Sequence, residues 1–570
     1  MSRSTTFVKV SIALIGLIIT SVVNAKPIQL NNSGNIERFL ISPDNQYVVF
    51  NEFDVFGNLQ RYTTKIDNES NPTRIGTNVN ETLNGLPFWI HRNNSRVIGR
   101  FNNPITNDRD FLSVSIDGSN SVLLRPATPI TGDVATMRTG ESSTPIIAFN
   151  IGFGGGLYSM PSDGSSAAIN LSDVIDPTSN IDVGRFRITQ NDSMVVFDAE
   201  LDAIDQHALF SVPIDGSANP LQLTPLNDSI VNNYQISEDQ SFIIYVEETG
   251  SGATLQQQLF NVPIDGSSEP VPLTDLISGD LEDIDFKISP DDSHVVYSIV
   301  DELTNEVKLF SVSSNGNSSP QLIDEGIELH QFEITNNNEF IIYSITQSFP
   351  DNPFVSEPNI PVLLRSPLIP EGNNEPTLLS DPGFDIFIGI GTTETTPNRI
   401  NPNVRFEVTS DSQFVYFIQD FTGDFVSVSL VPHLLRVTIN NPISRIQIND
   451  NSIGTPLDIA PSSVENFILS NNEQTIIYQI SNILITGGIL DSGSQLARAS
   501  ANGDNNELLP TLTVGNVNQF EISNDDEFVI FTADSGPNNT ENLYSIRLSD
   551  SEPLCFPIKD KNDNFVTICL

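Results

Sequence analysis

The chain contains few of the residues that usually mark a chemical site. Its 570 residues include 2 Cys, 1 Trp and 5 His. A zinc site needs more ligands than two Cys and five scattered His readily supply. The sequence also lacks the patterns G-x-S-x-G, G-x-x-x-x-G-K-[ST], G-x-G-x-x-G, H-E-x-x-H and C-x-x-C. The nucleophile elbow, the phosphate-binding loops, the zinc-protease helix and the redox motif are therefore excluded, and no catalytic residue is predicted.

Basic residues are also scarce. Lys and Arg number 26 against 72 Asp and Glu, which gives a formal net charge of −46. A net negative charge of this size repels the phosphate backbone of DNA or RNA, so no nucleic-acid partner is expected. An acidic, well-solvated surface instead favours partners that carry basic groups or cations.

Long apolar runs are confined to the N-terminus. Arg3 and Lys9 precede the apolar run 10–23, and Val23-Asn24-Ala25 fits a signal-peptidase site. This pattern predicts a signal peptide over residues 1–25 and an exported protein, periplasmic or extracellular. The run is short for a membrane span of about 20 residues. A retained anchor is the alternative, and the rest of the chain is not expected to be membrane-embedded.

The two cysteines lie together near the C-terminus, in CFPIKDKNDNFVTIC. Turn-forming residues between strand-like flanks predict a hairpin over 553–570. In an oxidising compartment, a Cys555–Cys569 disulfide would close a loop of about 15 residues and contribute roughly 3 kcal/mol; two free thiols are the alternative. Within this loop, Asp560-x-Asn562-x-Asn564 resembles the start of a calcium loop but lacks its Gly and its distal Glu. No cofactor is expected, and a divalent cation such as calcium is the one candidate.

One phrase recurs along the whole chain. It is an aliphatic residue, a polar cluster and then a β-branched or aromatic triplet, as in ISPDDSHVVY from Ile288. Further copies are ISPDNQYVVF from Ile41, ITQNDSMVVF from Ile188, ISEDQSFIIY from Ile236, ITNNNEFIIY from Ile334, VTSDSQFVYF from Val408, LSNNEQTIIY from Leu469 and ISNDDEFVIF from Ile522. Weaker copies at Ile90 and Met137 bring the count to about ten.

Most units carry two later phrases, such as LFSVPIDGS over 209–217 followed by PLQLT at Pro220. Short β-branched and aromatic segments between Asn, Asp, Ser and Gly turns predict four strands per unit, and no long helical periodicity appears in the mature chain. The fold class is therefore all-β. A four-stranded unit cannot bury both its faces alone, and a ring of such units does so, which predicts a β-propeller.

The arrangement of the units stays open at this level. About ten units form one large ring or two rings, and 381–403 is the candidate boundary or insertion. An open β-solenoid is the structural competitor. Residues 27–30 resemble a fourth-strand phrase and compete with the C-terminal tail for the role of closing the last blade.

The paired phrases resemble the TolB-like family of propeller repeats, the PD40 or WD40-like group. The resemblance covers about residues 26–570 and implies a β-propeller. It implies little about activity, since this repeat serves binding proteins, peptidase accessory domains and a few lyases. The Gly usual in the first turn is replaced by residues that tolerate turn conformations, Gln240 least comfortably. The replacements are Asn45, Asp192, Gln240, Asp292 and Asn338.

The strand before each polar cluster often reads aromatic–x–aliphatic, and the resemblance implies that it lies innermost, beside the central channel. Strand alternation places the middle residue on the opposite side from its two neighbours. Two interpretations stay open for the middle residues: interblade ion pairs and hydrogen bonds, or a polar channel lining that binds a small ligand or ion. The candidates are Arg187, Gln235, Lys287, Glu333, Glu407 and Glu521.

These observations favour a binding or scaffold protein whose partner is a protein or a cell-envelope component. The alternative is a propeller-type polysaccharide lyase or hydrolase with a site at the channel mouth. Convergence of His and carboxylates there would favour the enzyme, and paired charges would favour the binder. The histidines occur at different phases of the repeat, at His91, His207, His294, His330 and His433.

Overall fold

The computed structural model describes residues 27–569 apart from 32–33, 68–70, 76–87, 92–95, 103–108, 125–133, 141–145, 152–155, 174, 176–180, 202–205, 227–229, 251–253, 279–284, 302–305, 349–358, 371–374, 381–398, 401–404, 423–429, 443–444, 450–462, 487–488, 511–515, 536–539, 551–554 and 560–564. The predicted signal peptide, most of the candidate boundary at 381–403 and the calcium-like pattern at 560–564 lie outside the described residues.

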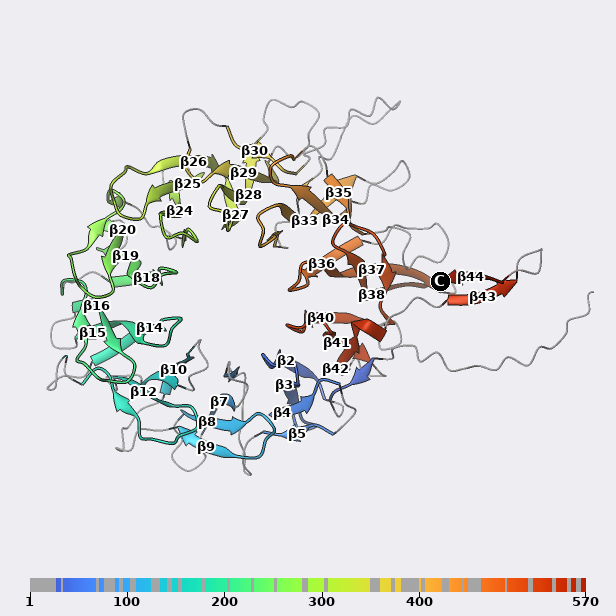
Figure 1. Cartoon of the computed structure of the whole chain (residues 1–570), viewed down its shortest axis with the longest axis horizontal. Helices are drawn as coiled ribbons and strands as arrows, with labels where there is room; N and C mark the ends of the chain where they lie inside the picture. Colours follow the sequence, from blue (N-terminus) through green and yellow to red (C-terminus); the bar gives the residue numbers. More distant parts are fainter. Residues whose placement is uncertain are drawn as a thin grey trace, which may run out of the picture.

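Ten antiparallel blades follow one another around a single closed ring (Figure 1). The fold is therefore an all-β propeller, as predicted, and the question of one ring or two is answered in favour of one. In the described part of the chain, helical structure is confined to short 3-10 turns, such as η3, Leu548–Asp550.

The strands of the first five blades run in the following order from the channel outward. Blade 1 is β2 (Ile36–Ile41), β3 (Tyr47–Phe53), β4 (Leu59–Lys65) and β5 (Thr73–Arg74); blade 2 is β6 (Phe88–Ile90), β7 (Arg96–Asn102), β8 (Arg109–Ser115) and β9 (Ser121–Leu124); blade 3 is β10 (Val134–Thr139), β11 (Ile146–Ile151), β12 (Leu157–Pro161) and β13 (Ile169–Asn170); blade 4 is β14 (Ile181–Ile188), β15 (Met194–Leu201), β16 (Gln206–Pro213) and β17 (Leu221–Gln222); blade 5 is β18 (Ile230–Ile236), β19 (Phe242–Thr249), β20 (Gln256–Pro263) and β21 (Val271–Pro272), with β22 (Ile277–Ser278) also paired to β20.

The other five blades complete the ring in the same order. Blade 6 is β23 (Phe286–Ile288), β24 (His294–Asp301), β25 (Glu306–Ser313) and β26 (Gln321–Gly326); blade 7 is β27 (Glu328–Ile334), β28 (Phe340–Ser348), β29 (Asn359–Pro367) and β30 (Thr377–Leu378); blade 8 is β31 (Arg399–Ile400) and β32 (Glu407–Val408), both paired to β33 (Phe414–Thr422), then β34 (Leu430–Thr438) and β35 (Arg445–Gln447); blade 9 is β36 (Ser463–Leu469), β37 (Thr475–Thr486), β38 (Ile489–Ser500) and β39 (Glu507–Leu508); blade 10 is β40 (Val517–Ile522), β41 (Phe528–Ser535), β42 (Thr540–Arg547) and β1 (Ile28–Gln29).

The second strand of each blade is apolar on both faces because each face packs against a neighbouring blade. In β3, Val48, Val49 and Phe50 are all fully buried. Val48 and Phe50 join the apolar cluster shared with blade 10, whereas Val49 joins the cluster shared with blade 2. The VVF and IIY triplets are therefore continuous apolar runs, as expected for a strand covered on both sides.

Aromatic pairs repeat at the same place in six blades, where the second and third strands lie side by side. Their ring centroids are between 5.3 and 5.7 Å apart and the rings are stacked, a geometry that adds to the energy of area burial. The pairs are Phe50–Tyr62, Phe149–Tyr158, Phe197–Phe210, Tyr245–Phe260, Tyr297–Phe310 and Phe531–Tyr544.

The polar cluster between the first and second strands of a blade is a tight turn, called here the first turn. In blade 6 the Asp291 Oδ1 atom accepts hydrogen bonds from the Ser289 and Ser293 hydroxyls, each 2.7 Å long. The next residue, Asp292, has φ of 60°. Eight first turns hold a non-glycine residue in this left-handed region, at Asn45, Asp192, Gln240, Asp292, Asn338, Ser412, Glu473 and Asp526.

Seven of these eight left-handed residues accept a hydrogen bond from the backbone of the preceding blade through their side chains, which explains why glycine is absent from these positions. The Asp292 carboxylate accepts hydrogen bonds from the backbone amides of Glu238 and Asp239 in blade 5, both 2.8 Å long. Hydrogen bonds to a charged acceptor contribute about 1.5–3 kcal/mol, which offsets the cost of roughly 1 kcal/mol for left-handed backbone. Equivalent bonds join Asn191 to Gln240, Asp291 to Asn338, Asn337 to Ser412, Ser410 to Glu473, Asn471 to Asp526 and Asn524 to Asn45.

The N-terminal strand β1 closes the ring as the fourth strand of blade 10. Ile28 and Gln29 pair with Ser545 and Tyr544 of β42. Of the two candidates that the sequence left open for closing the ring, the segment 27–30 is therefore the one that does so. The competing C-terminal tail instead forms a separate hairpin of β43 (Cys555–Lys559) and β44 (Phe565–Cys569), which lies outside the ring (Figure 1).

Candidate functional site

The six candidate lining residues lie on the innermost strands of six blades, β14, β18, β23, β27, β32 and β40 (Figure 1). The described contacts fit both of the interpretations left open. Four of the six residues form a hydrogen bond or an ion pair with a neighbouring blade: Gln235, Lys287, Glu333 and Glu407. Four of the six also line a cavity: Arg187, Gln235, Glu333 and Glu407.

The basic and amide members of this set contact the following blade. The Lys287 ammonium lies 2.6 Å from Glu333 Oε1 and 5.5 Å from the centre of the Phe332 ring. The Gln235 amide donates a hydrogen bond of 2.5 Å to the Phe286 carbonyl. A side chain of blade 5 is therefore bonded to the backbone of blade 6, and a side chain of blade 6 is paired with one of blade 7.

The acidic members follow the same rule. The Glu407 carboxylate of blade 8 accepts a hydrogen bond of 3.2 Å from the Leu469 amide of blade 9. Burial raises the pKa of Glu521 in blade 10, and the charge of Arg38 in blade 1 lowers it. This electrostatic contact couples the two blades at the point where the ring closes.

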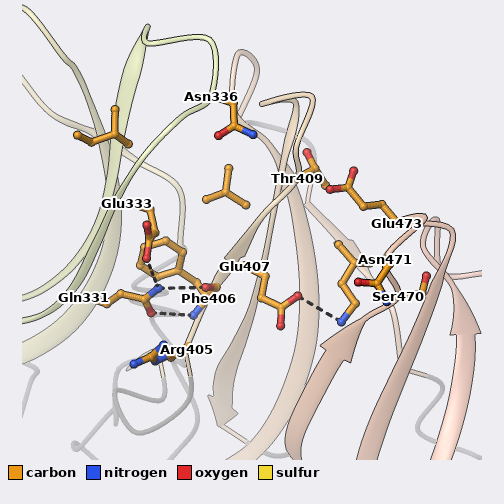
Figure 2. Close-up of a pocket in the computed structure, with 13 residues that line it drawn as sticks. Gln331, Glu333, Asn336, Arg405, Phe406, Glu407, Thr409, Ser470, Asn471 and Glu473 are labelled. Carbon is orange, nitrogen blue, oxygen red and sulfur yellow. Dashed lines mark hydrogen bonds between the residues drawn. The ribbon is translucent and has the colours of Figure 1, made fainter. Parts of the chain in front are cut away.

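Two cavities open at the first-turn face, where the innermost strands end. The acidic pocket has a volume of about 540 Å³ and lies between blades 7, 8 and 9 (Figure 2). Its charged lining residues are Glu333, Arg405, Glu407 and Glu473. Glu333 and Glu407 were predicted from the innermost-strand pattern, and the structure brings them to one pocket.

Hydrogen bonds fix the walls of the acidic pocket. The Gln331 amide bonds both to the Phe406 amide and to its carbonyl, each at 3.2 Å, and joins blade 7 to blade 8 (Figure 2). The Glu473 carboxylate accepts a hydrogen bond of 2.6 Å from the Ser410 amide. The carboxylates of Glu407 and Glu473 are therefore each held by a backbone amide of a neighbouring blade.

Glu407 has the most strongly altered titration in the acidic pocket. Burial raises its pKa to about 7; the hydrogen bond from Leu469 opposes this shift and the charge of Glu473 adds to it. A carboxyl group that titrates near neutral pH within a cavity is a candidate for proton transfer or for ligand binding.

The basic pocket has a volume of about 350 Å³ and lies between blades 3, 4 and 5. Among the described residues, its charged lining residues are Arg138 and Arg187, and none of those that line it is acidic. The Arg187 guanidinium lies 5.5 Å from the centre of the Tyr234 ring of blade 5. Burial raises the pKa of Tyr234 well above its usual range, and the nearby Arg187 and Arg138 charges oppose that shift. The predicted residues Arg187 and Gln235 therefore lie in a second pocket of opposite character.

Sequence reasoning missed Arg138, Arg405 and Glu473. Arg138 follows Met137 in place of the usual aromatic residue, so its unit is a weak copy of the repeat. Glu473 occupies the first-turn position in the phrase that begins at Leu469, and the sequence analysis did not single it out. Arg405 precedes the aromatic Phe406, and strand alternation applied to that side as well would have identified it.

The five histidines lie on five different blades. Within the described ranges, no group of three or more His, Cys, Asp or Glu is placed to hold a metal ion. The same part of the chain contains no apolar helix of membrane-spanning length.

No family model and no curated protein matches the chain. Solved structures with similar propellers include a prolyl endopeptidase, with a TM-score of 0.33 and 12% identity over 68% of this chain and 53% of that chain. A putative TolB from Agrobacterium tumefaciens has a TM-score of 0.26 and 12% identity over 60% of this chain and 95% of that chain. An oligogalacturonate lyase in complex with manganese has a TM-score of 0.34 and 8% identity over 92% of each chain.

The chain spans little more than half the length of the prolyl endopeptidase, and 59% of a puromycin-hydrolyzing peptidase from Mycobacterium tuberculosis that it resembles at a TM-score of 0.31 and 11% identity over 80% of this chain. These similarities concern propeller architecture alone. The class that the fold defines is a ten-bladed β-propeller.

Proposed function

We propose that the protein is an exported propeller scaffold that binds a protein or a cell-envelope component at the first-turn face. The observation that supports this most is the acidic pocket, in which Glu407 and Glu473 accept hydrogen bonds from backbone amides of neighbouring blades. A fixed cavity lined with carboxylates suits a Lys or Arg side chain, or another cationic group, presented by the partner.

The ring favours binding by rigid display. The blades are joined by Lys287–Glu333, by Gln331–Phe406 and by the bonds of the first turns. The ring therefore has little conformational entropy to lose when a partner binds. Preorganised sites lose less entropy on association, so a modest contact area suffices for specific binding. The net charge of −46 adds long-range attraction toward basic partners.

The test is capture from envelope extract by the protein from residue 26 onward. Glu407→Gln combined with Glu473→Gln keeps hydrogen-bond acceptors in place but removes charge, and should abolish capture of the partner. Glu269→Gln removes a charge from an exposed residue outside the pocket and should leave capture unchanged. Capture that survives the double substitution, or no specific capture by the unaltered protein, would contradict the proposal.

A second candidate, a polysaccharide lyase or hydrolase with its site at the channel mouth, draws support from the Glu407 pKa of about 7. General acid–base catalysis works best with a group whose pKa is close to the working pH, and exposed Arg405 in the same pocket could hold an acidic sugar. New reducing ends or unsaturated products from an acidic polysaccharide, lost in Glu407→Gln, would favour this function over the scaffold.

A further inference from the structure

The basic pocket is unusual for this chain. Acidic residues outnumber basic ones 72 to 26, yet no carboxylate is among the described residues that line this cavity. Its lining instead combines two guanidinium groups with amides and hydroxyls, chiefly Arg138, Arg187, Gln190, Gln235, Gln240 and Thr139. The described charged residues around this cavity are therefore basic, whereas the protein as a whole has a net charge of −46.

The two arginines are not used to hold the fold together by ion pairs. Both are exposed, and no carboxylate among the described residues forms an ion pair with either of them. On the innermost strands of blades 6 and 7, by contrast, the charge of Lys287 is paired with that of Glu333. Two like charges from adjacent blades beside one cavity repel each other, and an anion bound between them would relieve that repulsion.

The amides of the pocket retain hydrogen-bonding capacity. Gln240 accepts a hydrogen bond from the Asn191 amide through Oε1, which leaves its Nε2 group as a donor. Gln235 donates through Nε2 to the Phe286 carbonyl, which leaves its Oε1 atom as an acceptor. A donor and an acceptor next to guanidinium groups suit a ligand that carries hydroxyl groups as well as a negative charge.

We propose that the basic pocket binds a small polyhydroxylated carboxylate, with its carboxylate at Arg138 and Arg187 and its hydroxyl groups at Gln235 and Gln240. The planar fork of arginine matches a carboxylate in a two-point hydrogen bond. A volume of about 350 Å³ lies at the small end of ligand pockets and fits a compound of six or so carbon atoms. This site is distinct from the acidic pocket and does not depend on the proposed function.

The experiment is calorimetric titration of the protein from residue 26 onward with four probes of related size and different chemistry. D-gluconate carries both groups, D-glucitol lacks the carboxylate, hexanoate lacks the hydroxyls, and inorganic phosphate is a simple anion. Gluconate should bind most tightly, and its affinity should fall as salt is raised. Equal binding of glucitol, hexanoate or phosphate would overturn the assignment, and so would an absence of gluconate binding.

Substitutions separate the pocket from general charge. Arg138→Gln and Arg187→Gln should each weaken gluconate binding by about tenfold or more, because each removes a charge-assisted hydrogen-bond donor. Arg185→Gln removes an exposed charge two residues from Arg187, outside the cavity lining, and should change the affinity less than about threefold. An equal loss in all three variants would overturn the proposal, with unaltered melting temperatures showing that each variant is folded.

Discussion

Lys287 Nζ lies 2.6 Å from Glu333 Oε1, so an ion pair joins the innermost strands of blades 6 and 7. The two side chains are 35% and 38% exposed, which places the pair at the border of the channel and not in the core. Solvent therefore screens much of its attraction.

We predict a modest coupling energy between these two residues. Lys287→Met, Glu333→Gln and the double variant should give a coupling of about 0.5–1 kcal/mol at low salt, since partly exposed pairs contribute little. Urea unfolding of the four proteins measures it, and the value should fall in 0.5 M salt. A coupling that is zero at low salt would show that the contact is not an energetic link.

The left-handed first-turn residues give a second prediction. Asp292→Ala should lower the free energy of unfolding by about 2–3 kcal/mol, because it removes the interblade acceptor and keeps the unfavourable backbone. Asp292→Gly should cost about 1 kcal/mol less, since glycine adopts this conformation freely. A glycine variant about 1 kcal/mol more stable than the unaltered protein would mean that the interblade bonds contribute nothing.

The matched control for this series is Asp265→Ala. Asp265 is exposed and accepts a hydrogen bond of 3.0 Å from Ser267 within its own turn. Asp265→Ala should lower the free energy of unfolding much less than Asp292→Ala does, because no neighbouring blade is involved.

Glu407 should make stability depend on pH. Its pKa is about 7 in the folded protein and near 4.5 when exposed to water, so the folded state binds the proton more tightly. The contribution of Glu407 to the free energy of unfolding is therefore largest below about pH 4.5. It falls by up to about 3 kcal/mol as the pH rises to about 7. Glu407→Gln should remove this loss, and unfolding of both proteins at pH 5 and pH 8 should show the variant gaining relative stability at pH 8. Parallel pH profiles for the two proteins would be inconsistent with a raised pKa.

Cys555 and Cys569 are directly opposite one another in the pairing of β43 with β44. Opposed residues in antiparallel strands have Cα atoms about 4.5–5.5 Å apart, within the range that a disulfide spans. We predict that the protein carries this disulfide when it is made in an oxidising compartment, and that its intact mass then rises by two hydrogens on reduction. Labelling of two free thiols before reduction would refute this.

The repeat pattern predicts the blades well because turn and strand chemistry is local. Asp292 and Asn338 stand where a turn needs left-handed backbone, and both have that conformation. The number of blades could be counted for the same reason. The number of rings could not, since it depends on the small rotation between blades and not on any one residue.

The channel residues were predicted less completely. Strand alternation predicts which side of the strand a side chain lies on, but it does not predict which residue of the next blade that side chain contacts. The positions of Glu333 and Glu407 on innermost strands were recognisable, but the bonds to Lys287 and Leu469 depend on how blades stack. Arg138 and Arg187 form one pocket only because blades 3 and 4 are neighbours in the ring.

Closure of the ring by β1 has a consequence for the order of assembly. Asn31 donates a hydrogen bond to Asn542, 511 positions away, and Leu30 is buried with Phe528, Ile530 and Leu543. The apolar face of blade 1 therefore stays uncovered until nearly the whole chain has been made. The entropic cost of closing a loop grows only with the logarithm of its length, so closing this long loop adds little free energy. The main consequence is the long time for which this face stays exposed during synthesis. Blade 10 is the last blade to form and the one that closes the ring. Until it forms, an unfinished chain would expose the apolar face of blade 1 to chaperones, proteases and other copies of the chain.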